Sequence, residues 1–112
     1  MAQTKQVVLT TTVQAATAWQ PSRFVNYAGA QASAGDAVLG VSAYAADQGD
    51  MAAVDVVGIA IVEAAGAIAS GDSVAADAQG LAIKLGGSGI AAGRALDAAS
   101  SAGETIRILL GA

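Results

Sequence analysis

Apolar and polar residues alternate in two segments of the second half of the chain. Within residues 81–85, leucine or isoleucine occupies every second position. Residues 105–110 repeat the alternation, with Ile106, Ile108 and Leu110 on one face. A period of two is typical of a β-strand with one buried face. Both segments are therefore predicted to be strands whose large apolar side chains face the core.

A longer apolar run lies near the middle of the chain. Residues 56–62 are apolar on both faces and rich in β-branched side chains, which predicts a central strand covered on both sides. Residues 7–13 form a threonine-rich strand candidate, and residues 23–27 and 37–41 are shorter ones. The chain is thus predicted to fold from several short strands.

Glycine-containing turn signals separate these segments at short intervals. They are Gly-Asp pairs at residues 35–36 and 71–72, and polar clusters at residues 48–50, 77–80 and 86–89. Glycine accepts a positive φ and aspartate bonds back to its own backbone, so such clusters mark chain reversals. The fold class predicted is all-β, a small β-sandwich or barrel of short antiparallel strands. We interpret the similar Gly-Asp turns as repeated use of a good turn rather than as an internal repeat.

The abundant alanine allows one short helix, over residues 90–102. The preceding sequence Gly87-Ser88-Gly89-Ile90-Ala91-Ala92 fits the glycine motif of dinucleotide-binding folds. That motif requires a carboxylate at the end of the following strand to hold the ribose, and this sequence ends there with glycine and alanine. We therefore interpret residues 87–92 as a glycine-rich hairpin loop and expect no cofactor.

Composition narrows the possible functions of what we predict to be a single soluble domain. The 112 residues include five Lys or Arg and nine Asp or Glu, a net charge of −4, and the bases are scattered. Nucleic acids and membrane surfaces bind clustered bases, so neither partner is expected. Only 12% of the residues are charged, which favours a surface partly covered by other subunits.

The sequence offers little material for catalysis or metal binding. It contains no cysteine and no histidine, which excludes thiol chemistry, catalytic triads and zinc sites built on those residues. The carboxylates Asp47, Asp50, Asp72 and Asp77 could bind calcium or act as an acid–base pair, but their spacing suits turns better. We expect no catalytic residue, no metal and no enzyme activity, and we expect Trp19 to lie in the core or in an interface.

The second half of the chain carries a series of short motifs in a characteristic order. They are Gly58-Ile59-Ala60, Ala67-Ile68-Ala69-Ser70-Gly71-Asp72-Ser73-Val74, the turn at residues 77–80, Gly93-Arg94-Ala95-Leu96-Asp97-Ala98-Ala99, and Ile106-Arg107-Ile108-Leu109-Leu110. This series resembles the capsid cement proteins of tailed bacteriophages, a family of small head-decoration proteins. The resemblance covers residues 35–110 and is best from residue 56 onward.

The resemblance implies a β-rich domain that binds the outside of an icosahedral phage head and stabilises it, without catalysis. The implied partner is the major capsid protein. The implied assembly is a homotrimer at local three-fold axes, similar to the lambda-type head-stabilising proteins. The implied location is the outer capsid surface of the virion, after assembly in the host cytoplasm. The alternative function is a stand-alone all-β binding module of a tail or adhesin that recognises a protein or a carbohydrate.

The first twenty residues are interpreted separately from the remainder. Residues 1–20 are predicted to be an N-terminal strand or arm, and residues 21–112 a single β-rich decoration domain. An extended segment with few charges can add its backbone hydrogen bonds to the edge of a neighbour's sheet, and the lambda-type proteins use a similar arm. An ordinary first strand of the domain's own sheet is the alternative. The candidate capsid contacts are Thr4, Lys5, Gln6, Val7 and Val8.

Overall fold

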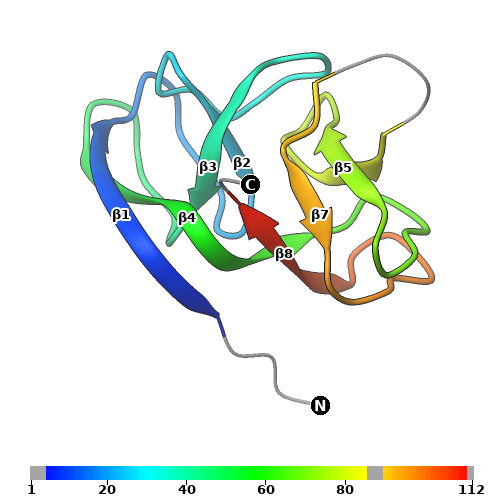
Figure 1. Cartoon of the computed structure of the whole chain (residues 1–112). Coiled ribbons are helices and arrows are strands. Elements are labelled where there is room, and N and C mark those ends of the chain that lie inside the picture. Colours follow the sequence, from blue (N-terminus) through cyan, green and yellow to red (C-terminus); the bar gives the residue numbers. More distant parts are fainter. Residues whose placement is uncertain (1–4, 86–89, 111–112) are drawn as a thin grey trace.

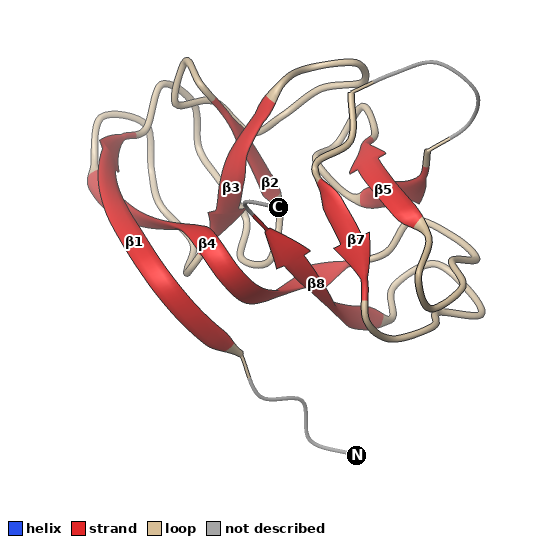
Figure 2. Cartoon of the chain, viewed as in Figure 1, coloured by secondary structure: helices blue, strands red, loops and turns tan. Residues whose placement is uncertain are grey.

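The computed structural model describes residues 5–85 and 90–110, and these residues form strands and loops without a helix (Figure 2). The all-β prediction is confirmed. The strands are β1 (Gln6–Gln14), β2 (Phe24–Asn26), β3 (Val38–Ser42), β4 (Met51–Glu63), β5 (Ser73–Ala76), β6 (Ala82–Lys84), β7 (Gly93–Ala95) and β8 (Thr105–Leu110).

The long strand β4 is the centre of the sheet, as its two apolar faces predict. Neighbouring strands follow the order β2-β3-β4-β8-β7-β5-β6. In this order β3 and β8 pair with successive parts of one edge of β4, and β1 pairs with the opposite edge. All of these pairings are antiparallel. The sheet curls into a nearly closed, barrel-like shape (Figure 1). A parallel bridge between Ala64 and Ala82 links the end of β4 to β6.

The short helix that the sequence allows over residues 90–102 does not form. Arg94 and Ala95 lie in β7 and pair with Leu109 and Ile108 of β8. A Cβ on Gly93 would lie 2.5 Å from the carbonyl oxygen of Leu109, so the strand packs as closely as only glycine allows. Strand pairing therefore overrides the modest helix propensity of alanine. Of the glycine motif, residues 87–89 lie outside the described residues.

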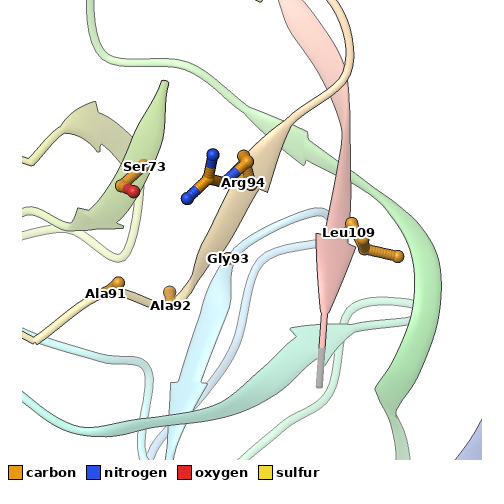
Figure 3. A pocket seen from close by; sticks show the side chains of 6 residues that line it. All are labelled: Ser73, Ala91, Ala92, Gly93, Arg94 and Leu109. Carbon is orange, nitrogen blue, oxygen red and sulfur yellow. The ribbon is translucent and has the colours of Figure 1, made fainter. Parts of the chain in front are cut away.

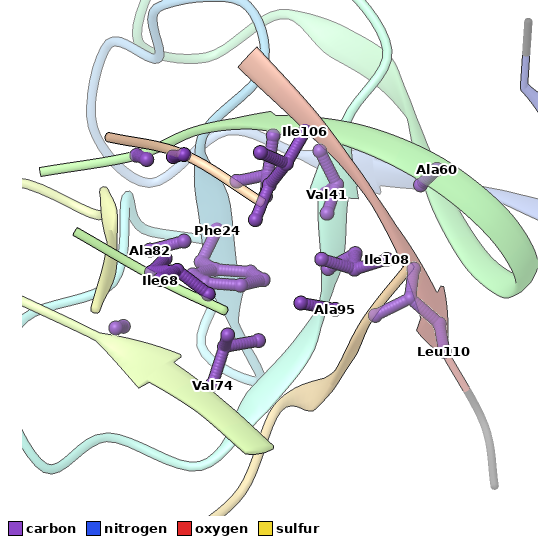
Figure 4. Close-up of a cluster of buried hydrophobic side chains, with 14 of the residues drawn as sticks. Phe24, Val41, Ala60, Ile68, Val74, Ala82, Ala95, Ile106, Ile108 and Leu110 are labelled. Carbon is purple, nitrogen blue, oxygen red and sulfur yellow. The ribbon is translucent and has the colours of Figure 1, made fainter. Parts of the chain in front are cut away.

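The predicted alternation holds in one strand and fails in another. Ile106 and Ile108 of β8 are fully buried, as expected. In β6, Ala82 is buried while Ile83 is exposed, the reverse of the prediction. Ala82 faces the hydrophobic core, where it pairs with Ala76, bridges to the end of β4 and lies beside Phe24 and Ile68 (Figure 4). A core packed this closely has room for alanine and not for isoleucine.

The fold contains an internal repeat that the sequence analysis did not predict. The first repeat spans residues 10–56 and the second spans residues 59–110, so both use part of β4. In the first repeat, β1 pairs with the start of β4 through Gln14–Met51 to Thr10–Asp55. In the second, the end of β4 pairs with β8 in the same register. That register runs from Glu63–Thr105 to Ile59–Leu109.

Hydrogen bonds outside the strands repeat in the same way. Ala15 donates to the carbonyl of Asp50 and accepts from the amide of Gly49, both at 2.8 Å. Ala64 makes the equivalent pair of bonds, donating to Glu104 at 2.8 Å and accepting from Gly103 at 2.9 Å. The isolated bridge Trp19–Ala46 likewise corresponds to Ile68–Ala99. The similarity is therefore one of whole repeats and extends well beyond a shared turn.

The hydrophobic core is repeated as well. The first-repeat core is made of six buried residues, Ala15, Trp19, Val25, Ala46, Ala52 and Val54. Their counterparts belong to the second-repeat core: Ala64, Ile68, Val74, Ala99, Ile106 and Ile108. Phe24 and Val41 of the first repeat also pack into the second-repeat core, beside Ile106, Ile108 and Val74 (Figure 4). The two repeats are thus joined by apolar burial as well as by β4, which stabilises them as one unit.

Four turns of one kind close these repeats. In each, glycine has a positive φ, and the following Asp or Glu carboxylate accepts the backbone amide of the residue three positions earlier. The turns cover residues 33–36, 47–50, 69–72 and 101–104. The Gly-Asp pairs in the sequence were therefore the visible signal of the repeat.

Candidate functional site

The N-terminal segment packs against the chain's own sheet. Lys5 places its Nζ 3.0 Å from Oδ2 of Asp55, and the Thr10 hydroxyl donates to Oδ1 of the same carboxylate at 3.1 Å. The Asp55 side chain is only 5% exposed, so these two groups replace the water that the charge has lost. Of the predicted contacts, Lys5 is therefore engaged within the chain, and Thr4 lies outside the described residues.

A β-bulge lies where the other predicted contacts are found. Gln6 pairs with Ile59 and Val7 with Gly58, and the register then shifts before Leu9 pairs with Val57. Val8 is the extra residue and is 79% exposed. A bulge of this kind redirects a side chain away from the sheet. Gln6, Val7 and Val8 therefore lie together, with Val8 projecting into solvent.

Gly58 makes this bulge possible. Its φ is +115°, a conformation that other residues rarely adopt. A Cβ there would lie 2.5 Å from the carbonyl oxygen of Gln6 and 2.7 Å from the amide nitrogen of Val8. The backbone of β1 can approach β4 this closely only because residue 58 has no side chain.

The outer face of the sheet carries an apolar stripe, defined here as Leu9, Val57, Ile59 and Leu109. Leu9 pairs with Val57 across β1 and β4, and Ile59 pairs with Leu109 across β4 and β8. Leu9 and Leu109 are exposed, and the two β4 residues are half-buried. Exposed apolar side chains gathered over three strands are typical of a surface that binds another protein.

A shallow hollow of about 220 Å³ adjoins one end of this stripe (Figure 3). Its lining includes Ser73, Ala91, Arg94 and Leu109. The Arg94 side chain extends toward Ser73, and Leu109 points away from it toward β4 (Figure 3). Within the described part of the chain, the Arg94 guanidinium has no hydrogen bond or ion pair. The hollow therefore combines small apolar walls with an uncompensated positive charge.

Three of the four carboxylates considered as metal ligands or acid–base groups accept backbone amides in turns. Asp50 accepts the amide of Asp47 at 3.0 Å, and Asp72 accepts that of Ala69 at 2.9 Å. Asp77 accepts two amides of its own turn. Across residues 5–85 and 90–110, no three Asp or Glu side chains gather as metal ligands would. The same residues include no helix that is long and apolar enough to cross a membrane.

Hydrogen bonds also shift the pKa of three charged side chains, those of Asp36, Glu104 and Arg107. Hydroxyl donors on Ser100 and Ser101 lower the pKa of Glu104. The Asn26 amide, followed by the backbone amide of its turn, lowers the pKa of Asp36 in the same way. Asp97 raises the pKa of Arg107 through two short hydrogen bonds of 2.9 Å each. All three shifts favour the charged form, so these groups stabilise loops and do not prepare a proton transfer.

The comparisons with known proteins point to a structural protein of a phage particle. The sequence profile of the phage cement protein family matches residues 2–110. The chain belongs to that family. The predicted family is thereby confirmed, and the match extends over the N-terminal third, where the sequence motifs did not reach. Membership supports a structural role in decorating and stabilising a phage capsid.

The fold is shared with a solved phage structure. The N base of the head fiber gp8.5 of bacteriophage phi29 superposes with a TM-score of 0.76 at 19% sequence identity. The superposition covers 92% of this cement protein and 93% of the phi29 chain. At this identity the likeness establishes the fold. No curated protein matches the sequence.

Sequence reasoning missed the stripe and the hollow for a physical reason. Leu109 lies in an alternating strand and Arg94 was part of a family motif, but neither position indicates which strands become neighbours. The only local signal was that residues 56–62 are apolar on both faces, whereas a strand with one buried face needs apolar side chains on that face alone. The outward-facing residues of that segment, Val57 and Ile59, are the part of the apolar stripe that lies in β4.

Proposed function

We propose that this cement protein binds the major capsid protein on the outer surface of a phage head and stabilises the shell as a homotrimer at local three-fold axes. It acts by binding alone, without catalysis, and joins the virion after capsid assembly in the host cytoplasm. Family membership supports the role. Many equivalent contacts on one shell would multiply a modest affinity at each site.

The observation that carries the proposed contact is the exposed edge at the start of β1. Among the described strands, β1 pairs with β4 alone, so its other edge has free backbone donors and acceptors. Val8 projects from the bulge on this strand. A strand of the capsid protein can add to such an edge, and a protruding apolar side chain then fills a pocket in the partner. The proposed contacts are Thr4, Lys5, Gln6, Val7 and Val8.

A head-binding experiment tests this proposal. Purified heads that lack the protein are mixed with it, sedimented, and assayed for bound protein and for release of DNA on heating. Wild-type protein should sediment with the heads and raise the temperature of release. Val8→Asp should fold normally and lose most binding, because a charge would have to be desolvated at the contact.

The matched control is Tyr27→Asp, at a position that is 71% exposed and lies outside β1. This control should bind as the wild type does. Equal binding by Val8→Asp and wild type would reject the β1 contact while leaving the decoration role intact. Failure of the wild type to bind heads would reject the decoration role itself and favour a binding module of another phage structure.

A further inference from the structure

The hollow beside Arg94 occupies a position that is covered in the other repeat. A row of cross-strand neighbours, Ser73–Arg94–Leu109, runs from β5 over β7 to β8. Its counterpart in the first repeat is Phe24–Val41–Asp55, running from β2 over β3 to β4. A Cβ on Gly40 would meet the carbonyl oxygen of Asp55, as one on Gly93 would meet that of Leu109, so the two rows have the same backbone geometry.

The two rows differ in what covers them. Phe24, Val41 and Asp55 are all buried, the first two by packing into the second-repeat core. In the second repeat, Arg94 and Leu109 are exposed. The same site is therefore filled within the chain once and left open once.

The residues at the open site favour a protein partner with an acidic and apolar surface. We define the cationic patch as Ser73, Ala91, Arg94 and Leu109. Leu109 stands where the first repeat has Asp55, which is covered by Lys5 and Thr10, so an ion-paired position has become an apolar one. The exposed Leu109 side chain points toward β4, so it lies at the edge of the cationic patch while the unpaired Arg94 guanidinium lies over Ser73 (Figure 3). Such a surface matches a partner that offers a carboxylate with an apolar side chain at a short distance from it.

The chain itself presents such a surface on its first repeat. We define the acidic patch as Tyr44, Asp47, Asp50 and Met51. Tyr44 reaches β4 by accepting a hydrogen bond from the Ala53 amide at 3.1 Å, close to Met51 on the same strand. Tyr44 and Met51 are 51% and 64% exposed. The Asp47 carboxylate has no hydrogen bond or ion pair to the described residues, and its charge is free to meet Arg94 of another copy.

We propose that the cationic patch of one copy docks on the acidic patch of a second copy of this chain. Such a contact joins two different surfaces, so it repeats head to tail and closes into a ring when the rotation allows. The homotrimer of the proposed function is one such ring. This inference therefore rests on that proposed self-association and assigns the surface that makes it.

Charge reversal with rescue tests the docking. Sedimentation equilibrium is measured for wild type, Arg94→Glu, Asp47→Lys and the double variant. Each single variant should weaken self-association about tenfold or more, because like charges then meet at the contact. The double variant should recover most of the wild-type affinity. Leu109→Ser, which removes the apolar half of the cationic patch at an exposed position, should also weaken it.

Lys84→Glu is the matched control. Lys84 pairs with Val74 rather than with Ser73, so it lies on the opposite face of the sheet from Arg94. Its reversal should leave self-association unchanged. Single variants that associate like the wild type, a double variant no better than the singles, or a wild type that stays monomeric at all concentrations would each overturn the docking.

Head binding by the same proteins separates the two proposals. A wild type that binds heads but associates independently of residues 47 and 94 retains the decoration role and loses this interface. A wild type that associates through these residues but ignores heads retains the interface and loses the decoration role.

Discussion

Replacing Gly58 by alanine should release the N-terminal end of β1 from the sheet. Residue 58 joins the two repeats within β4 and lies beneath the bulge that exposes Val8. Its φ of +115° is strained for any residue with a side chain. The added Cβ would also meet two backbone atoms of β1, at 2.5 and 2.7 Å, and neither can rotate away.

The expected cost follows from these two effects. A non-glycine residue in a rarely populated backbone region costs about 1–3 kcal/mol. Displacing β1 also breaks ladder hydrogen bonds at Gln6 and Val7, each with a net contribution of about 0.5–1.5 kcal/mol. The free energy of unfolding should fall by about 2–6 kcal/mol. Since small domains are stable by about 5–15 kcal/mol, the variant should remain folded at low temperature.

Gly49→Ala is the matched control for backbone strain alone. Gly49 has a φ of +92°, and an added Cβ there would meet no atom within 4 Å. Denaturant unfolding should show Gly58→Ala to be less stable than this control by about 1–3 kcal/mol, the share of the lost ladder bonds. Hydrogen exchange at residues 6–8 should accelerate in Gly58→Ala alone. Equal stability and equal exchange in both variants would refute the close approach of β1 to β4.

Three further predictions concern the core and the loops. Ile108→Asp should give no soluble folded protein, because an unpaired buried charge costs several kcal/mol. Ile61→Asp should fold, because residue 61 is half-buried on the outer face of the sheet. Circular dichroism and solubility distinguish the two variants. Trp19→Phe should lower the free energy of unfolding by about 1–3 kcal/mol, measured with denaturant, because the buried indole donates at 2.8 Å to the carbonyl of Gly29. The pKa of Glu104 is lowered in the folded protein, so its ionised carboxylate stabilises the fold at neutral pH, and this stabilisation is lost as the pH falls through the ordinary pKa of 4.5 and below. Glu104→Gln should therefore make the free energy of unfolding less dependent on pH in that acidic range, as measured by acid unfolding.

The sequence predicts strands well where one face is buried by large side chains. Ile106 and Ile108 were placed correctly because they alternate with the polar residues Thr105 and Arg107, which mark the outward face of the strand. Ile61 was expected to be buried and is only half-buried, since its strand continues an outward apolar stripe. Ile83 was assigned to the core and is exposed, because the smaller Ala82 occupies the core-facing position of β6. Period-two patterns report apolar faces, and only the packing decides which of two such faces is covered.

The internal repeat was beyond sequence reasoning for a similar reason. Equivalent positions hold side chains of different size and polarity, such as Trp19 and Ile68, or Val41 and Arg94. Backbone hydrogen bonds define these equivalences, and they leave little trace in residue identity. The exceptions are the turns, where a positive φ requires glycine and the carboxylate accepts a specific amide. The docking surface could not be predicted because it depends on which copy of the repeat remains uncovered.

Cryo-electron microscopy of phage heads with and without this protein tests the central claim most directly. We expect additional density on the outer surface of the head at local three-fold axes. Each subunit of this density should fit the two-repeat fold, with the start of β1 against the major capsid protein. Identical reconstructions with and without the protein, or additional density confined to the inside of the shell or to the tail, would contradict the account.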